Sequence, residues 1–525
     1  MSPYRIADQR LTRLLDGGAG ALLNERRIGL EKESLRVNTR GTISSAPHPR
    51  ALGSALTNPY ITTDYSEALI ELITPPFTNM REALRFLCEA QQFVYSELDQ
   101  ELLWATSMPC VVRGETSIPI AEYGTSNPGL MKTVYRRGLG HRYGRVMQVI
   151  AGVHFNYSFP DAFWTAYREL EGDRRPHQVF VSESYMALIR NLQRFGWMVP
   201  YLFGASPAVC KSFLKDQATD MPSFDPSTYF QPYATSLRMG DIGYQNNQEN
   251  AVGIKACYDS LDAYIDSLVC AITTPCPQYA RIGVKVDGEY RQLNANLLQI
   301  ENEYYSTIRP KQVLNGNERP TLALQRRGIG YVELRSLDVN AYDPLGINTE
   351  QIYFLEAFLL FCLLHESPPL AERERLEIDE NELVTAHRGR EPGLKLRRRG
   401  EDLALADWGL ELCTQMAAVG ELLDRGTAGR PYTDALEAQR EKLRDPERTP
   451  SARMLADMRA HGEGFFAFGL RMSRQHQEYF RSRKLPEPRR RYFQDEAEGS
   501  LRRQQEMEAA DDVSFDEYLA RYFAQ

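Results

Sequence analysis

Four short segments alternate apolar side chains with acidic, histidine or arginine side chains, and this alternation constrains the fold more than any other feature of the chain. They run from Arg27 to Val37, from Asp64 to Thr74, from Ile150 to Phe159 and from Ile329 to Leu337. Because successive side chains of a β-strand point to opposite faces, each strand would present one apolar and one functional face. Antiparallel strands can bury the apolar face under helices and leave the other open. We therefore predict an α+β fold with a mostly antiparallel sheet.

The first two segments carry paired carboxylates. Glu31 and Glu33 stand two residues apart and share a face if the segment is a strand. Glu67 and Glu71 share a face in a strand, and their spacing of four also brings them together on a helix. Adjacent carboxylates repel one another unless they are protonated or neutralised, so a divalent cation is one physical reason for each pair. Taken alone, each pair is more simply explained by an exposed polar face or the wet edge of a helix.

The other two segments add a histidine, a third acid and an arginine. His154 and Asn156 lie on the polar face of one, and Glu333 and Arg335 share a face of the other. Alone, the histidine could be structural and the acid and arginine could form a cross-strand salt bridge, which is worth little at a surface. Four such strands together favour an open sheet face that holds cations. Oxygen ligands with one histidine suit Mg²⁺ or Mn²⁺ better than zinc.

Composition and charge fit a large globular enzyme. The chain has 525 residues, 42% of them hydrophobic and 25% charged, with a formal charge of -8. The charge argues against nucleic acid and anionic membranes as partners, and the basic runs Lys395 to Arg399 and Arg489 to Arg491 lie beside acidic residues, as on a solvated face. The apolar run from Tyr353 to Leu364 is too short for a membrane span and contains Glu356, which predicts a buried core helix.

The N-terminal segment and the cysteines predict a cytoplasmic protein. Charged side chains interrupt residues 1–16, so no continuous apolar segment precedes a signal-peptide cleavage site. The eight cysteines contain no C-x-x-C pair. This pattern predicts reduced, scattered thiols rather than a zinc site or the disulfide framework of a secreted protein.

Two parts follow one another along the chain. Up to residue 345, β-patterned runs alternate with helical stretches, and beyond it helical periodicity and dense charge dominate. We expect one catalytic unit over residues 1–525, with a sheet-rich active-site part at about 20–345 and a helical part at about 346–525. Gly17 to Gly20 lacks the spacing of a phosphate loop, and Gly204 to Pro207 lacks that of a nucleophile elbow. We predict a turn and a loop there.

Several longer motifs occur in order over nearly the whole chain. They are G-L-E-K-E-S-L-R-V from Gly29, I-T-T-D-Y-S-E-A-L-I-E-L-I-T-P from Ile61, Y-G-T-S-N from Tyr123, R-F-G-W-M-V-P-Y-L-F-G-A-S-P from Arg194, P-Y-A-T-S-L-R from Pro232, L-Q-I-E-N-E from Leu298, E-L-R-S-L-D from Glu333 and R-R-Q-Q-E-M-E-A-A-D from Arg502. With these motifs the chain resembles the bacterial glutamate-cysteine ligase family, which is related in fold to glutamine synthetase. The resemblance implies a curved, mostly antiparallel sheet that forms a funnel-shaped active site wrapped by helices.

The resemblance also implies roles for particular residues. The positions that match metal ligands of the family are Glu31, Glu33, Glu71, His154 and Glu333, whereas Glu67 matches none. Arg335 matches an arginine near the transferred phosphoryl group, and Arg238 resembles a substrate-binding or catalytic cation. The residues that resemble a cysteine pocket are Tyr65, Tyr135, Leu139, Gln148, Tyr244 and Tyr305. Tyr65 stands where the family often has phenylalanine.

The reaction implied by the resemblance is the first step of glutathione biosynthesis. ATP would convert the γ-carboxylate of L-glutamate into a γ-glutamyl phosphate, which the amino group of L-cysteine would attack, with Mg²⁺ or Mn²⁺ as cofactor. Glutathione is the feedback inhibitor to expect, and neither nucleic acid nor membrane is an expected partner. Two alternatives stay open: a related glutamate ligase that uses another amine, and a catalytically silent sensor of ATP or amino acids.

Overall fold

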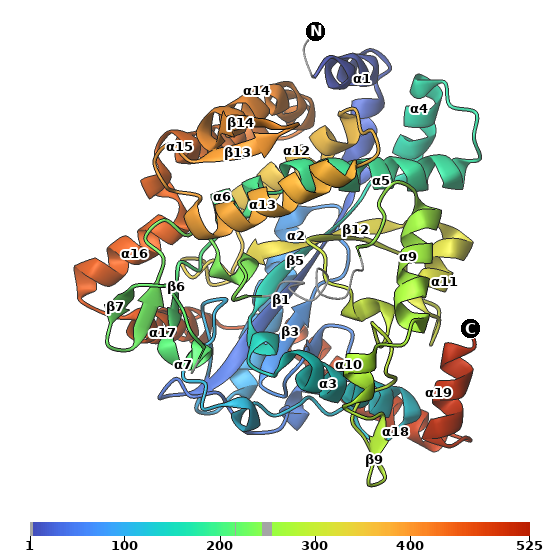
Figure 1. Ribbon diagram of the computed structural model, residues 1–525, viewed down its shortest axis with the longest axis vertical. Helices are drawn as coiled ribbons and strands as arrows, with labels where there is room; N and C mark the ends of the chain where they lie inside the picture. The colour runs from blue at the N-terminus through green and yellow to red at the C-terminus, as the bar shows by residue number, and fades with distance from the viewer. Residues whose placement is uncertain (1–3, 216, 244–254) are drawn as a thin grey trace.

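Within residues 4–215, 217–243 and 255–525, which the computed structural model describes, a seven-stranded antiparallel sheet forms the centre of the protein (Figure 1). Its order is β11-β12-β5-β1-β3-β2, and β4 pairs with the end of β1. The strands are β1 (Arg27–Asn38), β2 (Ile61–Thr63), β3 (Leu69–Ile73), β4 (Glu101–Leu103), β5 (Gly152–Ser158), β11 (Ile308–Lys311) and β12 (Tyr331–Asp338). All four segments that alternate in the sequence contribute a strand, which confirms the predicted α+β fold.

The two faces of the sheet follow from the alternation along β1. Glu31 and Glu33 project to one face, and Leu30 and Lys32 project to the other. Lys32 is an exception among the apolar side chains of its face, because it is buried and its Nζ donates to Gln91 Oε1 at 2.9 Å. Burial lowers the pKa of Lys32 to about 7. Alternation therefore correctly predicts which residues share a face, but it does not predict that this face accepts a lysine.

Helices cover the sheet on the face away from Glu31. Helix α2 (Met80–Glu97) packs on β1 and β3, α6 (Met198–Phe203) on β12, and α12 (Thr349–Leu364) on α5 (His177–Phe195). Helix α12 begins at a capping box in which Asn348 and Gln351 exchange hydrogen bonds, and nearly all its side chains are buried. This confirms the predicted core helix. Its one internal acid, Glu356, is neutralised by Arg26 at 2.5 Å.

The remaining elements connect and extend this framework. In the first part they are α1 (Arg5–Asp16), α3 (Asn127–Tyr143), α4 (Asp161–Glu171), α7 (Lys211–Leu214), α9 (Leu261–Thr273), α10 (Pro277–Ala280) and α11 (Pro320–Arg327). Two small sheets contain β6 (Ala208–Cys210), β7 (Ser223–Asp225) and β8 (Thr228–Phe230), and β9 (Lys285–Val286) with β10 (Glu289–Tyr290).

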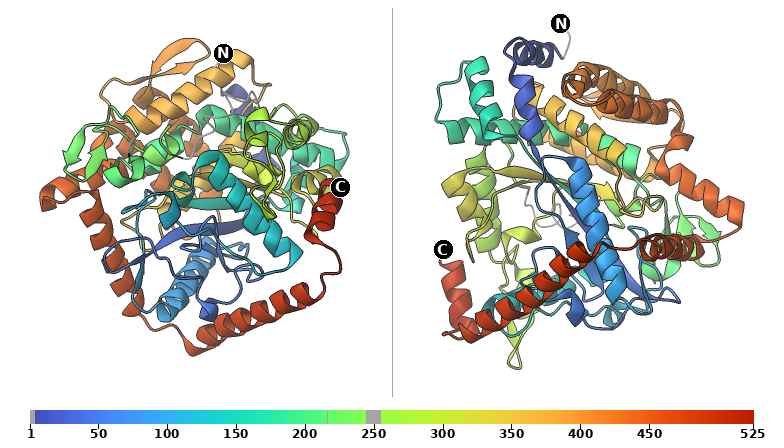
Figure 2. Two further views of the ribbon diagram at one scale, coloured as in Figure 1. Left: turned by 60° about the horizontal axis from the view of Figure 1, so that its bottom comes forward. Right: turned by 180° about the vertical axis from the view of Figure 1, so that it is seen from behind.

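Residues 346–525 form helices and one hairpin. Besides α12, the α-helices are α13 (Glu372–Arg388), α14 (Leu405–Asp424), α15 (Pro431–Arg444), α16 (Pro450–His461), α17 (Phe465–Arg481), α18 (Glu487–Ala509) and α19 (Phe515–Phe523), and the hairpin is β13 (Lys395–Arg398) with β14 (Glu401–Ala404). Figure 2 shows this part running around the molecule. Helices α17 and α18 pack on α2, and α19 packs on α3. One buried apolar cluster includes residues from Tyr4 to Phe493, so both parts of the chain share a core.

Three smaller predictions have an outcome in the fold. Gly17 to Gly20 forms a turn in which Gly18 has a φ of 66°, and Gly204 to Pro207 forms a loop, as expected. In contrast, the expectation of reduced cysteines is wrong for one pair, because Cys110 and Cys210 form a disulfide. These two residues are separated by 100 positions, and only the packing of their loops brings them together.

No helix in the described part of the chain is long and apolar enough to cross a membrane.

Candidate active site

The strand register brings the five predicted metal ligands onto one face of the sheet. Strands β3, β1, β5 and β12 are neighbours, and Glu33 lies opposite Glu71 while Glu31 lies opposite His154. His154 stands at the centre of the group. Its Nδ1 lies 2.9 Å from Glu31 Oε2 and 4.0 Å from Glu333 Oε1, and its Nε2 lies 3.7 Å from Glu33 Oε1. Each of the four strands thus contributes at least one of the five predicted ligands.

Two overlapping sets of these side chains have the dimensions of a metal site. Glu31, His154 and Glu333 form one set, and Glu33, Glu71 and His154 form the other, with the ligand atoms of each set within 4.8 Å of one another. Glu333 Oε2 is buried and makes no hydrogen bond within the described residues. Oxygen donors with a single nitrogen are the ligands that Mg²⁺ and Mn²⁺ prefer. The residues therefore fit a hard divalent cation.

The raised pKa values of two of the acids indicate that this cluster lacks compensating positive charge. Glu71 keeps part of its surface open to the cavity, but burial among protein atoms, together with the charges of Glu31, Asp64 and Glu33, raises its pKa well above the ordinary value. Burial also raises the pKa of Glu33. A bound cation would reverse both shifts, because metal ligation requires the deprotonated carboxylate.

The raised pKa of Glu71 leads to a stability prediction. The metal-free folded state binds more protons than the unfolded state between the ordinary and the raised pKa, so its stability falls as the pH rises through that window. We expect Glu71→Gln to raise the Tm of the metal-free protein at pH 7.5 by roughly 2 °C, with a smaller gain at pH 5. Thermal unfolding in EDTA at both pH values measures this. An unchanged or lower Tm at pH 7.5 would contradict the assignment.

Two cations stand beside Glu333. Lys311 Nζ lies 3.3 Å from Glu333 Oε1, and Arg335 Nη1 lies 3.3 Å from Oε2. Burial raises the pKa of Glu333, but the charges of Lys311 and Arg335 outweigh burial and lower it well below the ordinary value. Sequence reasoning missed Lys311. Its signal was the alternation of Arg309 and Lys311 with Ile308 and Pro310 in β11, the strand that pairs with β12.

Four of the five predicted metal ligands, all except Glu33, and most residues of the predicted substrate pocket line a single cavity of about 560 Å³, a volume typical of small-molecule sites. The predicted site residues that line it are Glu31, Tyr65, Glu71, Tyr135, Leu139, Gln148, His154, Tyr305, Glu333 and Arg335. Tyr135 and Leu139 lie four residues apart on α3 and therefore face the cavity together. Tyr244 lies outside the described residues. Lys132 and Arg136 of α3 and Tyr518 and Tyr522 of α19 also line the cavity, and the sequence reasoning missed all four.

Arg238 and Glu67 do not line this cavity. Arg238, in a short 3₁₀ helix over Leu237–Met239, is buried; its Nη2 donates to the main-chain oxygen of Arg335 at 2.8 Å, and its Nη1 lies 3.7 Å from Asp338 Oδ1. It therefore stands directly behind Arg335. Glu67 accepts hydrogen bonds from the main-chain nitrogens of His48 and Glu122 at 2.6 and 2.7 Å, which is a structural role in agreement with its exclusion from the metal positions.

Together, the fold and the site define an enzyme whose cavity is built on the open face of an antiparallel sheet, with an acidic set suited to divalent cations and arginines suited to anionic groups. Comparison with known proteins identifies the family. The family model for glutamate-cysteine ligase matches residues 11–384. The glutamate-cysteine ligase of Alcanivorax borkumensis is 49% identical over 522 residues, covering 98% of this chain and 99% of that protein. The corresponding protein of Pseudomonas aeruginosa PAO1 is 48% identical, covering 99% and 98%.

Solved structures agree with this result. The crystal structure of a glutamate-cysteine ligase from Francisella tularensis in complex with AMP has a TM-score of 0.89 and 36% identity, covering 95% of this chain and 98% of that one. A bifunctional glutathione synthetase from Pasteurella multocida, with a TM-score of 0.71 and 23% identity, shows the same fold over 90% of this chain. This chain belongs to the glutamate-cysteine ligase family, and it is a ligase.

Proposed function

We propose that the cavity joins the γ-carboxylate of L-glutamate to the amino group of L-cysteine at the expense of ATP, which is the first step of glutathione biosynthesis. The observation that carries this proposal is the continuity of one cavity, which runs from the acid and histidine set to the tyrosine-lined wall. A reaction between a phosphorylated carboxylate and an amine requires both substrates in one space. The AMP in the Francisella tularensis structure supports a nucleotide as the third occupant.

The chemistry follows from the weak reactivity of a carboxylate. Its oxygen attacks the γ-phosphorus of ATP, ADP leaves, and the resulting γ-glutamyl phosphate has phosphate as a leaving group for the attack of the amine. Glu31, Glu33, Glu71, His154 and Glu333 would hold Mg²⁺ or Mn²⁺, which when bound supplies positive charge beside the phosphates. Arg335 offers a planar guanidinium to the phosphoryl oxygens in the same cavity.

Arg238 has a different task in this scheme. Its guanidinium holds the main-chain oxygen of Arg335 and faces Asp338, so it fixes the end of β12 from behind. Asp338 is itself held by the hydroxyls of Ser206 and Ser236, at 2.5 and 2.9 Å. We therefore assign Arg238 the role of positioning Arg335. The sequence-based expectation was a cation that binds substrate or acts in catalysis directly.

The aromatic wall leads to a prediction about substrate affinity. Tyr135 lines the cavity beside Leu139, where a small side chain would pack against the ring. We expect Tyr135→Ala to raise the KM for cysteine about tenfold while the KM for ATP changes by less than about twofold. Steady-state kinetics with each substrate varied measure this, and Tyr135→Phe, which keeps the ring, serves as the control. A larger rise in the KM for ATP than for cysteine would contradict the pocket assignment.

The reaction itself has a direct test. ADP release is measured with Mg-ATP and glutamate, with cysteine present or omitted, and the product is identified by mass spectrometry. We expect γ-glutamylcysteine and a strong dependence on cysteine. Faster turnover with another amine would favour the related-ligase alternative, and no turnover with any amine would favour a sensor.

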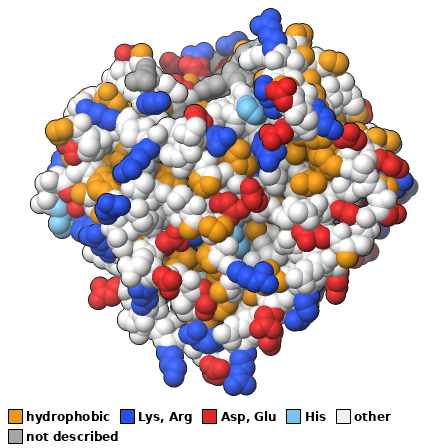
Figure 3. All heavy atoms as spheres, turned by 90° about the horizontal axis from the view of Figure 1, so that it is seen from below, with side chains coloured by type: hydrophobic (Ala, Val, Ile, Leu, Met, Phe, Trp, Pro, Cys, Tyr) orange, Lys and Arg blue, Asp and Glu red, His pale blue; other side chains and the backbone are white. Residues whose placement is uncertain are grey.

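Other parts of the assignment stay predictions. These are feedback inhibition by glutathione, the cytoplasmic location and the lack of nucleic-acid partners. On the face drawn in Figure 3, Lys and Arg side chains are interspersed with Asp and Glu, a distribution that supports the last of them.

A further inference from the structure

A second cavity of about 290 Å³ lies on the helical side of the molecule, and no residue lines both cavities. Its wall combines Tyr4, the end of α5, the start of α13 and the β13–β14 hairpin. The hairpin follows residue 384, where the match to the family model ends. The cavity therefore uses a part of the chain that lies outside that match.

The floor of this second cavity is aromatic and buried. Phe195, His365 and Trp408 are each at most 6% exposed. The ring of Phe195 meets His365 edge-on at 5.2 Å and Trp408 at 6.4 Å between ring centroids. Such a surface favours an apolar side chain, since burial of apolar area contributes about 25 cal/mol per Å².

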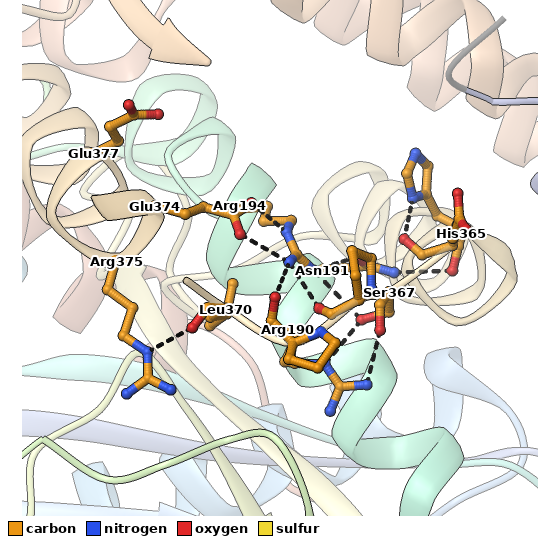
Figure 4. Close-up of polar contacts among 12 residues, drawn as sticks. Arg190, Asn191, Arg194, His365, Ser367, Leu370, Glu374, Arg375 and Glu377 are labelled. Carbon is orange, nitrogen blue, oxygen red and sulfur yellow. Dashed lines mark hydrogen bonds and ion pairs between the residues drawn. The ribbon is translucent and has the colours of Figure 1, made fainter. Parts of the chain in front are cut away.

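His365 adds an acceptor to this floor. Its Nδ1 donates to the main-chain oxygen of Glu366 at 2.7 Å (Figure 4). Burial, together with the charges of Arg194 and Arg399, lowers the pKa of His365, so the ring is neutral at pH 7. In that tautomer Nε2 accepts hydrogen bonds. Among the described residues no hydrogen bond to Nε2 is present, and His365, which is 5% exposed, lines the cavity.

Most charged side chains around the cavity are already paired. Arg194 holds Glu374 at 2.7 Å (Figure 4), and Arg398 holds Glu411 at 3.0 Å. In the described part of the chain, Arg399 and Glu366 form no ion pair or side-chain hydrogen bond. Glu401, which also lines the cavity, likewise forms no ion pair or side-chain hydrogen bond among the described residues, so one positive and two negative charges remain available at the rim.

The backbone at Arg399 has a conformation that is strained for an arginine. Arg399 and Gly400 form the turn between β13 and β14 with φ values of 54° and 87°. Glycine, which has no Cβ, or asparagine, whose short polar side chain can hydrogen-bond to the nearby backbone, is favoured at the first of these positions, because the Cβ of other residues is strained at positive φ. Such outliers are commonly kept for a function.

We propose that this cavity binds a free amino acid with a large apolar side chain and that binding there changes the ligation rate. The carboxylate of the ligand pairs with Arg399, its ammonium group donates to His365 Nε2 and faces Glu366, and its side chain lies on Phe195 and Trp408. Each group of the ligand thus meets a complementary group that is otherwise unused.

Helix α13 connects this cavity to the active site. Glu374, Glu377 and Asn381 of α13 line the second cavity. At the other end of the helix, the main-chain oxygen of Ala386 accepts hydrogen bonds from the nitrogens of Thr235 and Ser236 at 2.9 and 3.2 Å. Those residues lead directly into the 3₁₀ helix that carries Arg238. A displacement of α13 on binding would therefore reach the residue that positions Arg335.

Binding is tested by calorimetric titration of L-phenylalanine and L-leucine into the full-length protein with Mg-ADP and glutamate present. We expect saturable binding of at least one below about 1 mM. Phenethylamine, which lacks the carboxylate, and 3-phenylpropanoate, which lacks the amine, should bind about tenfold more weakly than L-phenylalanine. No saturable binding, or equal binding of the analogues, would overturn the proposal.

Two variants locate the binding. Arg399→Asn removes the charge while keeping a residue that tolerates the turn, and His365→Phe removes the acceptor while keeping the ring. Each should weaken binding about tenfold, whereas Arg425→Asn, an exposed arginine away from the cavity, should not. Wild-type affinity in Arg399→Asn would overturn the site. This binding experiment does not depend on the proposed reaction.

The effect on ligation is measured in the presence of saturating L-phenylalanine or L-leucine. We expect kcat at saturating cysteine to change about twofold or more in the wild-type protein, and Arg399→Asn to need about tenfold more amino acid for the same change. An effect that disappears at saturating cysteine would place the amino acid in the active site and overturn the proposal. Binding without any change in kcat would overturn the coupling through α13.

Discussion

Glu333→Gln is expected to reduce kcat/KM for ligation by about a hundredfold and to raise the Mg²⁺ concentration needed for half-maximal activity. Glu333 is 2% exposed and lies between Lys311, Arg335 and His154. Glutamine has nearly the same volume, so packing is kept while one negative charge is lost from the set that would hold the cation. Lys311 and Arg335 would then face a neutral amide, which does not offset their positive charge.

A titration of Mg²⁺ against activity measures this effect. Glu67→Gln is the matched control, because Glu67 is also a buried glutamate but contacts main-chain nitrogens outside the cavity. It should alter stability and leave the Mg²⁺ requirement unchanged. If Glu333→Gln kept the wild-type Mg²⁺ curve in a folded protein, Glu333 would not be a metal ligand.

Arg335→Lys is expected to lower kcat about tenfold or more while the KM values change less. The guanidinium can contact two phosphoryl oxygens at once, whereas the lysine ammonium keeps the charge but not the planar fork. Arg335 lines the cavity and is fixed at its main chain by Thr307 on one side and Arg238 on the other. A contact to oxygens that gain charge during transfer acts mainly on the transition state.

Rapid-quench measurement of ADP formation, with circular dichroism as a folding check, distinguishes this role from a purely structural one. Arg335 also pairs with Glu333 at 3.3 Å, and a lysine could preserve that ion pair. Phosphoryl transfer near the wild-type rate in folded Arg335→Lys would therefore favour the salt bridge. A rise in the KM for ATP with kcat unchanged would indicate that Arg335 contributes to ground-state binding instead.

Several features could be read from the sequence because they depend on local periodicity. The period of two placed Glu31 with Glu33 and Glu333 with Arg335 on shared faces, and the structure confirms both. The apolar run in α12 was long enough to predict a buried helix. Spacing within one strand or helix determines such relations, and tertiary contacts do not change them.

Other features arise only when distant segments pack together. The register that sets Glu33 against Glu71, the approach of Lys311 to Glu333 and the disulfide between Cys110 and Cys210 join segments whose separation carries no periodic signal. Helix α19, near the C-terminus, packs on α3 and adds Tyr518 and Tyr522 to the wall of the cavity. These contacts depend on how the helices cover the sheet. Burial of apolar surface is non-directional and stabilises whichever packing brings complementary surfaces together, so spacing along the chain does not reveal it.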